Sequence, residues 1–142
     1  MCLAAYYGGN AINKQLAGYV HAFAHSIGAL YHIPHGKAIA LCLIPIVSFH
    51  KNICMDKLAA LSIYCGFSKE TDDKLVAADK FIAALEELLK NCGFERGFDL
   101  IDEKDYKKLT NMINADSINY SPPKTLSNKE IVHLLNEIRN GR

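Results

Sequence analysis

Apolar residues recur along this chain at the three- and four-residue spacing of amphipathic helices, and no segment alternates apolar and polar residues as a half-buried strand would. The pattern predicts seven helices. They are expected over residues 3–12, 15–31, 34–52, 55–65 and 71–93, with a sixth starting near residue 102 and a seventh at residue 127. The sequence therefore predicts an all-α fold, a multi-helix bundle in one domain over residues 1–142. If the domain divides anywhere, the loop 93–99 is the expected position.

Four of the predicted helices have a clear core-facing stripe. The stripes are Leu16, Val20, Phe23, Ile27 and Leu30; then Leu75, Ala78, Ile82, Leu85 and Leu89; then Tyr106, Leu109, Met112 and Ile113; and finally Ile131, Leu134, Leu135 and Ile138. The last helix is preceded by Ser127, with Glu130 three residues later, which is the pattern of a capping box.

The helix over residues 34–52 is apolar on nearly all sides. Pro34 suits its first turn, and Pro45 is expected to kink it. Residues 15–50 hold one formal charge, Lys37, so a membrane hairpin is an alternative interpretation. Each helix is shorter than the roughly 20 apolar residues that a span requires, and histidines inside a bilayer are costly. We therefore expect these two helices to form the buried centre of a domain outside the membrane.

The composition narrows the possible partners and the compartment. A net charge of +1 gives no electrostatic reason to expect nucleic acid or an anionic membrane as a partner. The cysteines are odd in number and contain no Cys-x-x-Cys pair, so they are expected to be buried free thiols of a reducing, cytoplasmic compartment. Residues 1–10 lack the basic and apolar regions of a secretory signal.

Histidines are concentrated in one uncharged stretch. Residues 15–36 contain no Asp, Glu, Lys or Arg but hold four histidines. On a helical wheel His21, His25 and His32 fall on one face beside two glycines, opposite the apolar stripe. His35 follows the turn at Pro34, so its ring could return to the same place.

Such a cluster suits metal or substrate binding. Histidines four apart on a helix can chelate one ion, so spacing alone pairs His21 with His25, and His35 could add a third ring. Buried neutral imidazoles keep a lone pair free for a metal. The alternative without a function is that a histidine on an apolar face is a core residue whose ring makes its hydrogen bonds within the fold. We favour it for His32 and His50, and we expect His133 to lie on the surface.

The stretch also resembles a family signature. Gly18, His21, Ala22, Ala24, His25, Gly28, Ala29, Tyr31, Pro34, His35 and Gly36, followed by Leu-Ile-Pro45, match the pattern of the iron-containing alcohol dehydrogenases. The residues before the signature and the tail with its proline-bearing link fit as well. The chain is thus similar to the C-terminal helical domain of that family, within the dehydroquinate synthase-like superfamily.

The resemblance implies a fold, a site and a chemistry. It implies an N-terminal NAD(P)-binding domain, absent here, and a metal in the cleft between the two domains. His21 and His35 would be metal ligands, and His25 would be the catalytic, non-ligand histidine near the nicotinamide and the substrate. The other two ligands, an Asp and a His, would lie upstream of this chain. The ion would be Fe²⁺, with Zn²⁺ or Ni²⁺ as substitutes, and would act as a Lewis acid on an alcohol.

Because half of the ligands and the NAD(P) domain are missing, the chain alone is expected to be catalytically inactive. The apolar helix around residues 38–49 would then be partly exposed, which favours homodimerisation or association with an N-terminal half. One alternative is a non-catalytic helical module that acts by binding a partner. A weaker one is a domain of a zinc enzyme like glycerol dehydrogenase.

Overall fold

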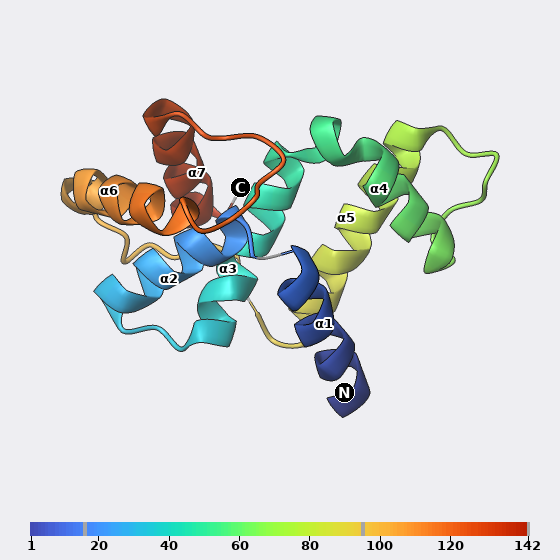
Figure 1. The fold of residues 1–142 in the computed structure, drawn as a ribbon, viewed down its shortest axis with the longest axis horizontal. Helices are drawn as coiled ribbons and strands as arrows, with labels where there is room; N and C mark the ends of the chain where they lie inside the picture. The colour runs from blue at the N-terminus through green and yellow to red at the C-terminus, as the bar shows by residue number, and fades with distance from the viewer. Residues whose placement is uncertain (16, 95, 142) are drawn as a thin grey trace.

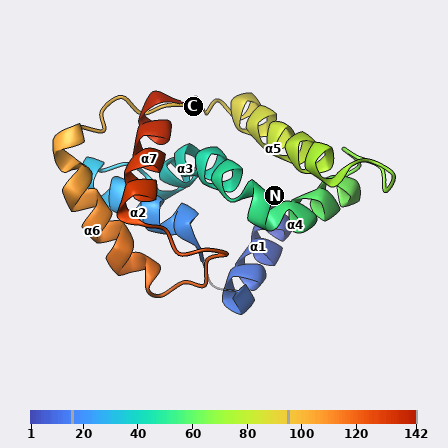
Figure 2. The ribbon, with the colours of Figure 1, turned by 90° about the horizontal axis from the view of Figure 1, so that it is seen from above.

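The computed structural model describes residues 1–15, 17–94 and 96–141, and within them the chain is helical with no strand. The helices are α1 (Cys2–Gln15), α2 (Tyr19–Tyr31), α3 (His35–Phe49), α4 (Lys51–Tyr64), α5 (Lys74–Asn91), α6 (Tyr106–Ser117) and α7 (Asn128–Asn140), with a short 3₁₀ helix, η1 (Glu103–Asp105), before α6. In Figure 1, α2, α3, α6 and α7 gather on one side and α4 and α5 on the other, and Figure 2 shows the same division from above. The predicted all-α class is confirmed.

The larger group, α2, α3, α6 and α7, surrounds the main core. Its fully buried large side chains are Phe23, Ile27, Ile101, Leu109, Ile113, Ile131, Leu134, Leu135 and Ile138. The predicted stripes of the last two helices are confirmed, except that Met112 is only partly buried. The capping box is also present, because Ser127 accepts from the Glu130 amide and Glu130 accepts from the Ser127 amide. This core fixes which face α2 turns toward solvent.

The smaller group is the pair α4 and α5, which packs on the far end of α3. Its buried cluster is small: Ile44, Leu58, Ala78 and Ile82. The chain turns by 107° between α3 and α4 at His50. Among the described residues no single helix is long and apolar enough to cross a membrane; α3 and α4 reach that length and composition only as a bent pair.

α1 stands apart from the other elements. Every residue from Met1 to Lys14 is exposed, and within the described part of the chain no other helix packs against α1. Its exposed side chains include Leu3, Tyr6 and Tyr7, each more than 60% accessible. Figure 1 shows α1 projecting away from both groups. This helix therefore carries apolar surface that the described chain does not cover.

Several predicted helix boundaries were wrong. The second helix begins at Tyr19, not residue 15, and the predicted stripe residue Leu16 lies outside the described residues. The third ends at Phe49, and residues 51–52 belong to α4. Because helical periodicity runs through His50 without interruption, the pattern could not show the bend. Pro45 lies inside α3, which remains one helix through it.

The fifth helix also starts later than predicted. Asp73 is its N-cap, and its carboxylate accepts from the amides of Leu75 and Val76 at 2.9 and 3.2 Å. A cap satisfies amides that have no partner within the helix, so Asp73 and not Thr71 sets the start. Leu75 is exposed, contrary to its predicted place in the stripe.

The cysteines are free, as predicted, but mostly not buried. Only Cys42 is fully buried, and that burial raises the pKa of its thiol. Cys2, Cys65 and Cys92 are exposed and Cys54 is partly buried. The apolar helix α3 is partly exposed, as expected, because Ile39, Leu43 and Val47 keep accessible surface.

Candidate functional site

The candidate site begins on the polar side of α2. Phe23, Ile27 and the small residues Ala22, Ala24 and Ser26 are buried against the main core. His21 is half-buried and His25 exposed, one turn apart. Anchoring the opposite side of α2 in the core therefore fixes both imidazoles on the accessible side.

A tight turn after α2 brings the third ring back. The amide of Ile33 donates to the Gly28 carbonyl at 3.1 Å. A Cβ on Gly28 would lie 3.2 Å from the Ile33 carbonyl oxygen, so a side chain there would crowd the turn. Glycine thus lets the chain reverse directly onto α2. His35, the first residue of α3, follows this turn.

The three rings lie close together. The ring centroids of His21 and His25 are 5.6 Å apart, those of His21 and His35 are also 5.6 Å apart, and those of His25 and His35 are 5.2 Å apart. The structure therefore brings together all three histidines that the sequence singled out for the site. His32 does not join them.

His32 ends α2 in a left-handed conformation, with φ 55°, and its side chain is exposed. The expected shared helix face and the expected core role were both wrong for it, because the helix stops one residue earlier. His50 is buried, as expected, and its Nδ1 lies 2.9 Å from the Ile46 carbonyl oxygen, but its buried Nε2 has no hydrogen-bond partner among the described residues. His133 is exposed, as expected.

Two further groups at the cluster come from α6 and the turn after it, which are distant in sequence but packed beside α2. Asp116, at the end of α6, places Oδ2 2.9 Å from His25 Nδ1. The Tyr120 hydroxyl donates to the same carboxylate, at 3.3 Å to Oδ1 and 3.2 Å to Oδ2. Sequence analysis missed both residues. The only signal available was an acidic and an aromatic residue four apart at the end of a helix, which is too common to single out.

The electrostatics of the cluster favour an uncharged ring at His21. Burial lowers the pKa of His21, and the neighbouring His25 and His35 lower it further, while Asp116 opposes them. Burial also raises the pKa of Tyr120, with the Asp116 charge and hydrogen bond acting in the same direction. A neutral His21 keeps the nitrogen lone pair that a metal or a hydrogen-bond donor requires.

The donor set is incomplete for a metal. Across residues 1–15, 17–94 and 96–141, no three histidine, cysteine, aspartate or glutamate side chains are arranged to hold a metal ion. His21 and His35 nevertheless offer two imidazoles side by side, and borderline divalent ions such as iron, zinc and nickel accept imidazole. The residues present thus fit part of a ligand set.

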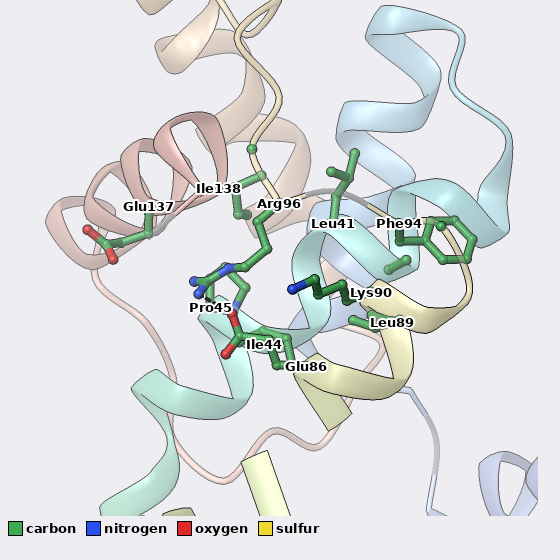
Figure 3. Close-up of a pocket in the computed structure, with 14 residues that line it drawn as sticks. Leu41, Ile44, Pro45, Glu86, Leu89, Lys90, Phe94, Arg96, Glu137 and Ile138 are labelled. Carbon is green, nitrogen blue, oxygen red and sulfur yellow. Dashed lines mark hydrogen bonds and ion pairs between the residues drawn. The ribbon is translucent and has the colours of Figure 1, made fainter. Parts of the chain in front are cut away.

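The described residues form an apolar groove beside the cluster and a separate cavity away from it. An apolar groove of about 400 Å³ runs beside His21 and is walled by Val20, Ile39, Leu43 and Val47 among others. A second cavity, of about 390 Å³, lies between α3, α5, the residues around Gly97 and α7, and no histidine lines it. Figure 3 shows Arg96 and Glu86 meeting there, at 2.7 Å. We assign the candidate site to the imidazole cluster, because it places three imidazoles, each able to ligate a metal or exchange a proton, with ring centroids 5.2–5.6 Å apart.

Fold and site together define an all-helical domain that presents clustered imidazoles beside an apolar groove. The family model described as Fe-containing alcohol dehydrogenase family, C-terminal, matches residues 1–139. The chain therefore belongs to the Fe-containing alcohol dehydrogenase family and corresponds to its C-terminal part.

Individual relatives agree. The chain is 30% identical over 139 residues to 1,3-propanediol dehydrogenase of Citrobacter freundii, covering 96% of this chain and 36% of that protein. It is 30% identical to NADPH-dependent butanol dehydrogenase of Clostridium saccharobutylicum, covering 92% and 34%. The solved alcohol dehydrogenase from Oenococcus oeni superposes with a TM-score of 0.84 at 26% identity, covering 92% of this chain and 34% of that one. The chain thus spans about a third of the length of these relatives.

Proposed function

We propose that this chain is the metal-binding C-terminal part of an NAD(P)-linked alcohol dehydrogenase. The enzyme would oxidise a primary or secondary alcohol, or reduce the corresponding aldehyde or ketone. The observation that carries the proposal is the clustering of His21, His25 and His35, with ring centroids 5.2–5.6 Å apart, in a member of this family. The names of its relatives, which include a propanediol and a butanol dehydrogenase, support an alcohol as substrate.

His21 and His35 are proposed as two of four metal ligands. A lowered pKa supports this role for His21, because the neutral ring leaves a nitrogen free to bind. An aspartate and a histidine from an Asp-x-x-x-His helix would complete the set. The ion would be Fe²⁺, or Zn²⁺ or Ni²⁺ in its place. When bound, it supplies Lewis acidity, and NAD(P) supplies the hydride-transfer chemistry.

His25 is proposed as the catalytic residue beside the nicotinamide and the substrate. Its side chain is 43% exposed, so a bound molecule can reach it, and its ring lies next to that of His35. The apolar groove beside His21 is suited to the carbon chain of an alcohol.

The division of labour between domains is part of the proposal. Residues 1–142 would form the helical metal-binding domain, and the remaining two-thirds of the relatives' length would correspond to the NAD(P)-binding domain and the missing ligands. Residues 1–142 by themselves would have no turnover, because under this proposal they supply only two of the four ligands and the other part supplies the NAD(P) site. Activity would require association with that other part, in one polypeptide or two.

Measuring bound metal tests whether His21 and His35 are ligands. The chain is assembled with the N-terminal part of the enzyme, and bound metal is measured for wild type, His21→Ala, His35→Ala and the matched surface control His133→Ala. We expect the first two variants to lose metal at least tenfold and the control to keep it. If neither His21→Ala nor His35→Ala changes metal content, the ligand assignment is wrong.

A non-catalytic role through partner binding is the second candidate function. It is favoured by the exposed apolar side chains of α1 and by the open groove beside His21. A homodimer, or a partner that lacks any nicotinamide site, would support it, whereas activity restored by an N-terminal half would exclude it. A zinc enzyme like glycerol dehydrogenase is a weaker alternative, and identification of the bound metal separates it from an iron enzyme.

A further inference from the structure

His25 has one nitrogen engaged and one free. Its Nδ1 lies 2.9 Å from Asp116 Oδ2, at normal hydrogen-bond length, while the Tyr120 hydroxyl is more distant at 3.4 Å. Within the described residues Nε2 has no hydrogen-bond partner. The two nitrogens therefore differ in environment, which is the condition for selecting one tautomer of a neutral imidazole.

The direction of the Asp116 contact follows from charge. An ionised carboxylate has no proton to donate, so His25 Nδ1 must be the donor. The Tyr120 hydroxyl donates to both oxygens of Asp116 and so gives the carboxylate a second hydrogen-bond partner beside His25. With the proton on Nδ1, a neutral His25 carries its lone pair on Nε2.

We propose that Asp116, supported by Tyr120, is a positioning residue that fixes His25 in the Nδ1–H tautomer and leaves Nε2 as a hydrogen-bond acceptor toward a hydroxyl-bearing ligand. The role as positioning residue for catalysis rests on the proposed function, since a hydroxyl donor at His25 is what an alcohol substrate would supply. The carboxylate and the imidazole belong to residues that are 91 positions apart, so the pairing depends on α6 packing against α2.

The tautomer can be measured directly in this chain without metal or cofactor. Chains labelled with ¹⁵N-histidine are examined by long-range ¹H–¹⁵N NMR above the pKa of the imidazoles. The Nδ1 and Nε2 shifts then distinguish a protonated from an unprotonated nitrogen. We expect wild-type His25 to hold the proton on Nδ1 in a ratio of at least about ten to one, because the acceptor is charged.

Asp116→Asn is the decisive variant. The amide has the shape of the carboxylate, but its NH₂ group can donate to Nδ1, so the proton is expected to move to Nε2. Tyr120→Phe keeps the carboxylate and should keep the Nδ1–H form. The matched control is Asp105→Asn, since Asp105 accepts from Tyr31, also on α2, at 2.9 Å without touching His25. That control should leave the His25 spectrum unchanged.

Either of two results overturns the proposal. One is a wild-type His25 with its proton on Nε2 or spread evenly over both nitrogens, which needs no variant to fold. The other is an Asp116→Asn spectrum identical to wild type. Failure of the proposed function is read separately, from metal content and turnover of the assembled enzyme, so the two results cannot be confused.

Discussion

The two helical groups of this chain differ in how firmly they hold their helices. α2, α3, α6 and α7 share a core that includes Phe23, Ile27, Leu109 and Leu135, all completely buried. α4 and α5 pack around the smaller Ile44 cluster and are joined by ion pairs at the surface, Lys51 with Asp79 at 2.7 Å and Lys74 with Asp56 at 2.8 Å. Exposed pairs of this kind contribute little to stability.

The difference has a consequence for the site. The imidazoles stand on α2 and α3, and their carboxylate partner stands on α6, so the whole cluster belongs to the group with the larger core. A constellation of side chains holds its geometry only where the elements beneath it are fixed by packing. We therefore expect the α4–α5 pair to open without disturbing the cluster, and changes in the main core to disturb both.

The largest effect is expected from Phe23→Ala. The side chain is fully buried in the main core, so its removal leaves a cavity and lowers the free energy of unfolding by about 3–5 kcal/mol. Urea unfolding followed by circular dichroism measures the loss. A loss below about 2 kcal/mol would mean that this core is no more tightly packed than the α4–α5 pair and would remove the contrast.

A smaller and more local effect is expected from Ile82→Ala. Ile82 lies in the minor cluster at 9% exposure, so its truncation should cost about 2 kcal/mol, at the low end for such changes. Amide hydrogen exchange should quicken in α4 and α5 while α2 and α6 keep their protection. Equal acceleration in all helices would show that the two groups unfold as one unit.

The two helix caps offer a matched pair. Ser127→Ala removes the capping box of α7, in the main group, and should lower global stability by about 1 kcal/mol. Asp73→Ala removes the cap of α5, and a similar cost should appear mainly as local fraying of that helix. Hydrogen exchange of the first turn of each helix, compared with urea unfolding, distinguishes global from local loss.

The smallest effect concerns acid pH. The Lys124 ammonium, with help from the Ser127 amide and hydroxyl, lowers the pKa of Glu130 to about 2. A carboxylate with a lowered pKa stabilises the folded state fully above its unfolded pKa, and this contribution is lost as pH falls from about 4.3 toward 2. Glu130→Gln should therefore narrow the difference in stability between pH 6 and pH 2, measured by thermal unfolding. Because the pair of Lys124 and Glu130 lies at the surface and Lys124 is exposed, high salt should shrink the effect. An unchanged difference would refute the pKa shift.

Much of the fold was predictable because it depends on local spacing. The buried faces of α6 and α7 follow from three- and four-residue spacing, and the α7 cap follows from Ser127 and Glu130 alone. The same reasoning failed at His50 and His32. The apolar pattern continues through the bend between α3 and α4 and through the left-handed residue at the end of α2. Periodicity therefore cannot predict either feature.

The candidate site likewise contains residues that local spacing predicts and residues that it does not. His21 and His25 share a face because they are one helical turn apart. His35 lies beside them because the short turn between Gly28 and Ile33 reverses the chain onto α2. Asp116 and Tyr120 were missed because they lie 91 and 95 residues from His25 in the sequence, and no local pattern links them to it. Their place depends on the packing of α6 against α2 and on the turn that follows α6.

By itself the sequence determined that the chain is helical, which residues of its last helices enter the core, and which histidines deserved attention. All of these depend on residues within a turn or two of one another. Only the tertiary structure decided that a carboxylate from α6 meets His25, that the chain turns by 107° at His50, and that, among the described residues, no other helix packs against α1. The physical reason is that helix periodicity fixes the direction of side chains around one axis, whereas the angle between axes depends on how whole surfaces pack.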